Sequence, residues 1–191
     1  DAAPEVYVGF EGAPGHQAAP LVGEVRGGYR GHPTYGGYDQ MTARVGGVWD
    51  ALLGEGRRWW ITATSDSHLH WTRGGGDFWP GEYSKTYVWA RQDYRDIMDG
   101  LRRGRIFVTT GDLISGLDLT ARQGGAAAGM GETLTLGRRP RGADLEIRFR
   151  PVQGTNGHGD RPQVRRVDLI VGEIIGPGGD PDADANPTTR V

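Results

Sequence analysis

The sequence predicts a mixed α/β fold in two parts, and two observations support this prediction. Before about residue 111, short β-favouring runs alternate with apolar residues at helical spacing, which is the order of β/α units. Beyond that point, apolar and polar residues alternate, as in antiparallel strands with one face in water. We therefore expect a β/α part over residues 1–111, a β-rich part over residues 112–175 and a flexible tail over residues 176–191, which is rich in glycine, proline and aspartate.

The first β/α unit consists of a strand, a long loop, a helix and a second strand. The strand is expected at residues 5–10, and the loop, rich in glycine, proline and tyrosine, extends to residue 40. Apolar residues then recur at helical spacing from Met41 onward, and Asp39 is placed to cap the start of this helix. The run at residues 59–64 is typical of a buried strand.

A second unit follows a polar, glycine-rich loop at residues 65–84. A strand is expected at residues 86–90 and another at residues 106–110. Between them, Tyr94 and the apolar residues that follow it indicate a helix, with Gly104 placed to end it. The β-rich part is expected to form strands at residues 117–120, 133–136, 145–149 and 167–171.

The composition excludes several classes of function. The net charge of −2 argues against a surface for nucleic acid or anionic membranes, which favour basic patches. Zero cysteines exclude disulfides, zinc–cysteine sites and thiol nucleophiles. No apolar run approaches the roughly 20 residues of a membrane helix. We expect neither a nucleic-acid nor a membrane partner, and the sequence does not indicate a cellular compartment.

The chemically most informative residues follow the predicted strand at residues 59–64. Asp66, His68 and His70 lie on the loop directly after it, and the carboxyl ends of parallel strands are where catalytic groups collect. Carboxylate and imidazole are usual ligands of Zn, Mn and Fe, and alternate residues of an extended chain face one side. The alternative is that these are ordinary loop residues that hydrogen-bond locally. From the residues alone, both interpretations stay open.

The chain from the first helix to Thr110 resembles the closing part of a PHP-type phosphoesterase, of the polymerase and histidinol phosphatase superfamily. The stretches that carry the resemblance are Trp49 to Leu53, Ile61 to His68, Gly75 to Tyr83 and Gly104 to Gly111. The resemblance implies the C-terminal portion of a distorted β/α barrel, followed by an antiparallel, β-sandwich-like extension. It also implies two or three divalent metal ions, here Zn, Mn or Fe.

The resemblance further assigns roles to individual residues. Asp66 and His68 match the late D-x-H metal motif of the family, and His16 is the best match to an earlier single histidine ligand. His70 is expected to act in catalysis by touching the substrate or supporting the metal ligands.

Three cations in the predicted loops are candidates for binding an anionic substrate. Lys85, Arg73 and Arg26 could stabilise a developing oxyanion, although each is more often a solvated surface charge.

The sequence departs from the family because the opening H-x-H motif of the barrel has no separate counterpart. We therefore expect an N-terminal half of the same gene product to supply the remaining metal ligands, so that this chain by itself can be inactive. The function expected is that of a metal-dependent hydrolase, a phosphoesterase with a small-molecule phosphoester substrate. The alternative is a non-catalytic binding or structural module that recognises carbohydrate or protein.

Overall fold

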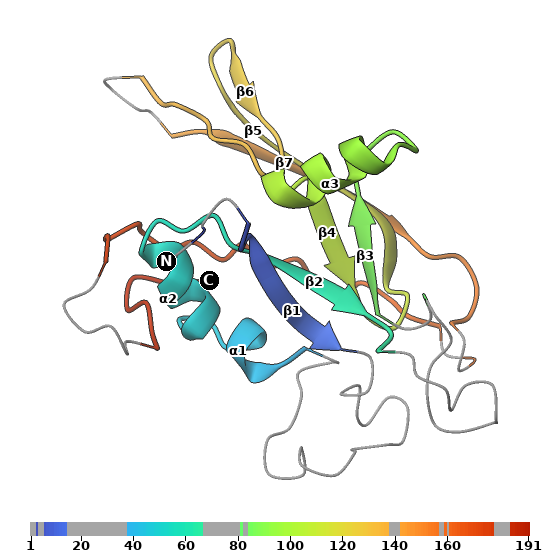
Figure 1. Ribbon diagram of the computed structural model, residues 1–191. Coiled ribbons are helices and arrows are strands. Elements are labelled where there is room, and N and C mark those ends of the chain that lie inside the picture. Colours follow the sequence, from blue (N-terminus) through green and yellow to red (C-terminus); the bar gives the residue numbers. More distant parts are fainter. Residues whose placement is uncertain are drawn as a thin grey trace.

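The computed structural model describes residues 3, 6–14, 38–66, 81, 84–137, 142–156, 159, 161–177 and 184–191. Within these ranges the chain forms a parallel strand pair, an antiparallel strand pair, a three-stranded antiparallel sheet and three helices (Figure 1).

The parallel pair consists of β1 (Gly9–Pro14) and β2 (Trp60–Thr64). Ile61 and Ala63 of β2 are buried, as expected of an apolar strand. The register shifts by one residue at Gly12, where a Cβ atom would lie 2.4 Å from the Oγ1 atom of Thr42. Glycine is therefore required in this β-bulge because the neighbouring helix approaches so closely.

Two helices, α1 (Gln40–Ala43) and α2 (Val48–Gly54), replace the single helix predicted from the apolar spacing. Asp39 caps α1 as predicted, accepting a hydrogen bond from the Met41 N–H at 2.7 Å. The break lies between the helices, where Gly46 adopts a positive φ of 76°. Two consecutive glycines at this point interrupt the helix, although the apolar stripe continues across them.

The antiparallel pair consists of β3 (Lys85–Val88) and β4 (Ile106–Thr109), joined by α3 (Tyr94–Arg103). Asp93 caps the start of α3, and Gly104 ends it in the left-handed conformation, as predicted. Tyr87 and Phe107 stack across the pair with their ring centroids 4.6 Å apart.

Thr86 connects the two strand pairs. Its hydroxyl accepts a hydrogen bond from the Ala63 N–H at 2.8 Å and donates one to the Ala63 carbonyl at 2.9 Å. A side chain of β3 thus satisfies the backbone groups of β2 that a neighbouring strand would otherwise pair, which holds the two pairs edge to edge.

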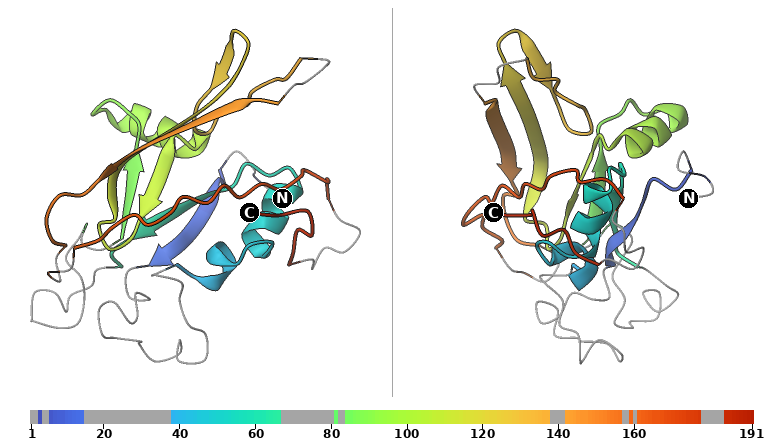
Figure 2. Two further views of the ribbon diagram at one scale, coloured as in Figure 1. Left: turned by 180° about the vertical axis from the view of Figure 1, so that it is seen from behind. Right: turned by 90° about the vertical axis from the view of Figure 1, so that its left-hand side faces the viewer.

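The three-stranded sheet has the order β6-β5-β7 and contains β5 (Ile114–Gln123), β6 (Ala126–Ala128) and β7 (Asp144–Pro151). Figure 2 shows that it extends away from β1, β2 and α2. The strands predicted at residues 117–120 and 145–149 lie inside β5 and β7. Residues 133–136 are not in a strand, and the run 167–171 forms only an isolated bridge between Val171 and Arg190.

The predicted β/α barrel is wrong. A barrel requires successive parallel strands joined by helices, whereas α3 joins two strands that run antiparallel. Within the described ranges the parallel strands number only two, and they do not close into a barrel. The extension after residue 112 is a single sheet, and the described strands provide no second sheet to complete a sandwich.

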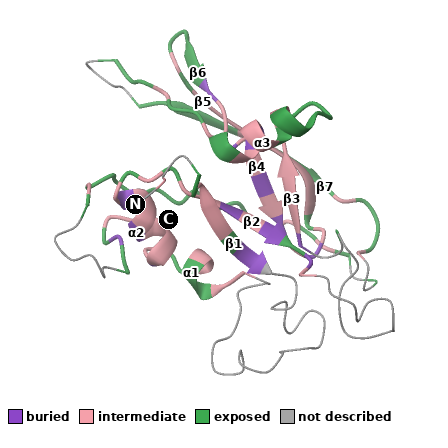
Figure 3. Ribbon diagram, viewed as in Figure 1, coloured by how far each residue is buried: buried purple, intermediate pink, exposed green. Residues whose placement is uncertain are grey.

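Few apolar residues are buried, and most of them lie in the two strand pairs, with Ala51 of α2 and Ala128 of β6 outside them (Figure 3). These buried apolar residues are Ala13, Ala51, Ile61, Ala63, Phe107 and Ala128. Among the described helices, none has the length and apolar character needed to cross a membrane.

Residues near the C-terminal end of the chain pack beneath the first two helices. Asn186 is 3% exposed, and its side-chain amide donates to the carbonyls of Asp50 and Glu173. Its Oδ1 atom accepts hydrogen bonds from the Thr188 N–H and hydroxyl. The predicted division into three segments stays a prediction.

Candidate active site

The strands β1, β2 and β4 end at the same side of the molecule, where β3 begins (Figure 1). Several polar side chains gather at this edge, and we refer to them as the strand-end cluster. The strand-end cluster consists of Glu11, Thr64, Asp66, Lys85 and Asp112.

Glu11, Thr64 and Asp66 are linked by hydrogen bonds at the end of the parallel pair. The Thr64 hydroxyl donates to a carboxylate oxygen of Glu11 on the adjacent strand. The Asp66 N–H donates to the same hydroxyl oxygen at 3.3 Å. One threonine at the last position of β2 therefore orients the carboxylate of β1 and fixes the backbone that carries Asp66.

Lys85 and Asp112 form an ion pair between the first residue of β3 and the turn after β4. Their side chains are 27% and 18% exposed, so the pair is partly shielded from water. Because Thr86 hydrogen-bonds to Ala63, Lys85 begins β3 beside the end of β2 that carries Thr64. Lys85 and the residues that carry the two carboxylates, Glu11 and Asp66, thus lie in or just after strands that meet at the same edge.

Asp66 and Asp112 share an unusual backbone conformation. They are the non-glycine residues with positive φ in the described part of the chain, with values of 51° and 56°. Aspartate tolerates this region better than most residues, but it is still strained relative to glycine. Such residues gather at functional sites, where the surrounding structure enforces them. Here Asp66 lies two residues after β2 and Asp112 three residues after β4, and these strands end at one edge.

Two buried serines are neighbours of cluster residues in the sequence, Ser65 between Thr64 and Asp66 and Ser84 before Lys85. Ser65 is 6% exposed and Ser84 is 1% exposed. The Ser84 hydroxyl is buried and, within the described residues, its oxygen makes no hydrogen bond. A buried hydroxyl without a partner is uncommon in a folded protein.

The structure describes only part of the site predicted from the sequence. Asp66 lies directly after β2, as expected, and Lys85 lies at the same edge. The other predicted site residues, which are His16, His68, His70, Arg26 and Arg73, lie outside the described residues. Among the residues that the structure does describe, no three His, Cys, Asp or Glu side chains form a group able to hold a metal ion.

The sequence analysis missed Glu11, Thr64 and Asp112. Glu11 and Thr64 lie within predicted β segments or next to one, and only the parallel pairing of β1 with β2 brings them together. Asp112 carried a detectable signal, because a Gly-Asp pair directly after a strand is typical of a tight turn.

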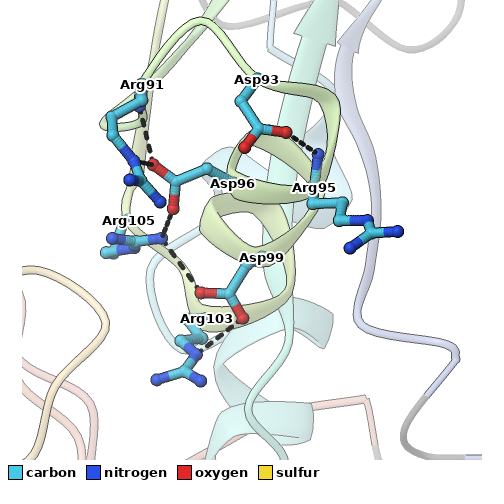
Figure 4. A network of polar contacts seen from close by, with 7 residues as sticks. All are labelled: Arg91, Asp93, Arg95, Asp96, Asp99, Arg103 and Arg105. Atoms are coloured by element: carbon cyan, nitrogen blue, oxygen red, sulfur yellow. Dashed lines mark hydrogen bonds and ion pairs between the residues drawn. The ribbon is translucent and has the colours of Figure 1, made fainter.

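A second charged group lies on α3, away from the strand-end cluster (Figure 4). Asp96 accepts hydrogen bonds from the Arg91 N–H at 2.7 Å and from Arg105 at 3.2 Å, and Asp99 pairs with Arg103 and Arg105. The Arg91 backbone N–H, with smaller contributions from the Arg105 and Arg91 side chains, lowers the pKa of Asp96 below its usual value. The Arg91–Asp96 contacts stabilise the turn before α3, and the contacts of Asp99 with Arg103 and Arg105 stabilise the C-terminal end of α3.

A cavity of about 410 Å³ lies at the opposite end of β2, lined by Tyr7, Glu55, Arg57 and Trp59 among others. The Arg57 guanidinium lies over the Trp59 ring, 5.6 Å from its centre, and its Nε pairs with Glu55 at 2.6 Å. The cavity does not include any member of the strand-end cluster. Of its two arginines, Arg57 is held by a carboxylate and a ring, and Arg58 donates a hydrogen bond to Thr133 at 3.1 Å, which argues against a catalytic site there.

No family model, curated protein or solved structure matches this chain. The resemblance to PHP-type phosphoesterases therefore stays a prediction, and the functional argument depends on the geometry of the strand-end cluster.

Proposed function

We propose that this chain carries part of the active site of a metal-dependent hydrolase, a phosphoesterase, at the strand-end cluster. The observation that supports this most is the position of Asp66, which lies in a strained left-handed conformation directly after the parallel strand pair. Catalytic groups of α/β proteins collect at this end of parallel strands.

The donor groups at this edge are of a chemical type that binds divalent metals. Glu11 and Asp66 offer carboxylate oxygens on adjacent chain segments, and these are ligands for Zn, Mn and Fe. Two carboxylates are fewer than the three or four protein ligands of a typical site. On this proposal His16 and His68 provide further ligands, and an N-terminal part of the same gene product provides the rest.

A metal held there would lower the pKa of a bound water and polarise the phosphoryl group. The side chains of the chain itself have simpler roles. The Thr64 hydroxyl holds the Glu11 carboxylate in one orientation, and Asp112 holds the Lys85 ammonium at the edge. Lys85 can then stabilise negative charge on a phosphoryl oxygen as it develops, with Arg26, Arg73 and His70 as further candidates.

The activity assay uses the full chain, alone and together with the upstream part of its gene product, and a chromogenic phosphomonoester with added Mn, Zn or Fe. Asp66→Asn removes the charge, yet asparagine also tolerates a positive φ. We expect metal-dependent turnover to fall by at least about 100-fold, the upper end of the loss found for residues that only support a ligand. The control Asp118→Asn changes an exposed aspartate of β5 and is expected to retain activity. Equal turnover by the Asp66→Asn variant and the unmodified chain would contradict the proposal.

A second candidate function is a non-catalytic module that recognises protein or carbohydrate. It is favoured by the exposure of β7, in which Leu145 is 38% and Phe149 40% exposed. Such a module needs no metal, and its binding would survive the loss of the Asp66 carboxylate, so the same variant distinguishes the two functions.

A further inference from the structure

The strand β7 forms one edge of the three-stranded sheet, and its outer side is open (Figure 2). Within the described residues, β7 pairs with β5 and with no other strand. The register of this ladder is continuous from Gly116↔Arg150 to Arg122↔Asp144. An edge of this kind presents unpaired N–H and C=O groups and is a template for pairing with another strand.

Of the usual protections of an edge strand, β7 has mainly charge, because Asp144, Glu146, Arg148 and Arg150 alternate along it. It has no lysine and no glycine, its proline is the last residue, and the described ladder with β5 has no bulge over residues 144–150. The other edge strand, β6, spans only Ala126–Ala128 and is too short to serve as a template. The charges of β7 therefore decide which strand can pair with this edge, and a strand of complementary charge is needed.

The residues of β7 are self-complementary about Ile147. If a second copy of β7 pairs with the first in antiparallel orientation, centred on Ile147, each residue faces a partner that suits it. The opposed residues are then Asp144 and Arg150, Leu145 and Phe149, Glu146 and Arg148, and the two copies of Ile147. All charged positions meet an opposite charge on one face, and all apolar positions meet apolar ones on the other.

Other registers lose this complementarity. Centring the pair on Glu146 sets two glutamates against each other, and centring it on Arg148 sets two arginines against each other. A two-fold axis placed between two residues shifts the register by one residue. Apolar side chains then lie opposite charged ones, because neighbouring residues of a strand point to opposite faces. The charge pattern therefore selects one register.

The exposure of the strand agrees with this arrangement. Every residue of β7 is exposed except Ile147, which is half-buried. Leu145 and Phe149 would join Leu117, which faces Phe149 in the ladder, and Leu119, which faces Ile147, in one continuous apolar surface. Pro151, which has no N–H to donate, would lie just beyond the end of the new ladder.

We propose that β7 is a homodimerisation edge, through which two copies of this chain join their sheets by antiparallel β7–β7 pairing about a two-fold axis at Ile147. The resulting six-stranded sheet would have the order β6-β5-β7-β7-β5-β6. The interface is isologous, as in most symmetric dimers. Because a single strand edge with its side chains is a small interface, we expect a concentration-dependent dimer in the micromolar range.

The charge pattern provides a direct test by exchange of charges at two positions. Glu146→Arg places arginine against Arg148 of the second copy, and Arg148→Glu places glutamate against Glu146. Each single variant should raise the dimer dissociation constant by at least about tenfold, because like charges meet twice across the two-fold axis. A 1:1 mixture of the two single variants should form a heterodimer, since all opposed charges are again opposite. The double variant Glu146→Arg/Arg148→Glu should dimerise like the unmodified chain.

Sedimentation velocity of the full chain over a concentration series measures these outcomes. Glu173→Arg makes the same change of charge at an exposed residue outside the sheet and should leave dimerisation unchanged. Within the chain, Glu146 faces the neutral Thr120 and pairs with Arg148 at 2.6 Å, and Arg148 faces Asp118. Circular dichroism of both single variants therefore checks that the internal ladder is kept. A chain that stays monomeric up to about 1 mM overturns the proposal. So does a dimer whose dissociation constant is unaffected by Glu146→Arg, or a mixture of the two single variants that does not associate.

Discussion

At the scale of single residues, a positive φ angle marks a position at which the backbone adopts a conformation that most residues avoid. Asp66 and Asp112 adopt such angles at the strand-end cluster, and Gly104 adopts one at the end of α3. A glycine can take this conformation without strain, whereas an aspartate needs the surrounding structure to enforce it. We therefore assign the positive φ of Gly104 to the fold, and those of Asp66 and Asp112 to function.

Gly104 offers a test of this account. A Cβ atom at residue 104 would lie 2.4 Å from the Trp60 ring, and φ is +71°. We expect Gly104→Ala to lower the free energy of unfolding by about 3 kcal/mol, through backbone strain and displacement of the ring.

The matched control is Gly124→Ala. Its φ is +57° and nothing lies within 4 Å of the added Cβ atom. This variant should lower the free energy of unfolding by only about 1 kcal/mol, because backbone strain is its only cost. Urea unfolding measures both, and equal losses would show that close packing of Gly104 against Trp60 does not contribute.

At the scale of elements, local sequence patterns predicted some parts well and others badly. The strands β2, β3 and β4 and the helix α3 lie close to their predicted ranges because each has a strong periodic pattern with a cap or turn at its end. The single helix after Asp39 was wrong because adjacent glycines break the backbone without changing the apolar period. Residues 133–136 and 167–171 alternate between apolar and polar but lie largely outside sheets. Such alternation indicates a strand with one exposed face, yet a sheet also needs a partner strand.

Other features could not be found locally. The strand β6 is three alanines, which carry no β signal. Strand direction is set by tertiary pairing, and for that reason the resemblance led to a barrel that the antiparallel β3–β4 pair rules out. Asp66 could be predicted because it follows an apolar strand, whereas Glu11 and Asp112 join it through pairing between distant segments.

The ion pairs of α3 predict how the stability of this element depends on pH. The Arg91 N–H and the two arginines favour the ionised form of Asp96, so its pKa lies below its usual value in the folded protein. A lowered pKa contributes stability above the unfolded value, and this contribution is lost as pH falls through the folded value.

We therefore expect Asp96→Asn to be less stable than the unmodified chain at neutral pH, with the difference shrinking as the pH falls below about 4. Thermal unfolding between pH 7 and pH 3 measures it. Asp118→Asn, an exposed position on β5, serves as the control. A difference that stays constant with pH would contradict this role for Asp96.

At the scale of the whole molecule, a small core holds together elements from distant parts of the sequence. Thr86 joins the two strand pairs, and Asn186 fastens residues near the C-terminal end to the carbonyls of Asp50 and Glu173. In both cases one polar side chain satisfies buried backbone groups where no ladder forms. The strand-end cluster depends on these connections, because Glu11, Asp66 and Lys85 come from three different strands or their ends.

We propose above all that this edge of the molecule binds a divalent metal through Asp66. The most direct measurement is elemental analysis of the full chain together with the upstream part of its gene product, after incubation with Zn, Mn or Fe and removal of free ions, for the unmodified chain and for Asp66→Ala. Asp118→Ala is the control for loss of a carboxylate elsewhere. We predict about one bound metal per chain in the unmodified protein and in the control, and none in the Asp66→Ala variant. A chain that holds no metal, or an Asp66→Ala variant that retains as much as the unmodified chain, would contradict the claim.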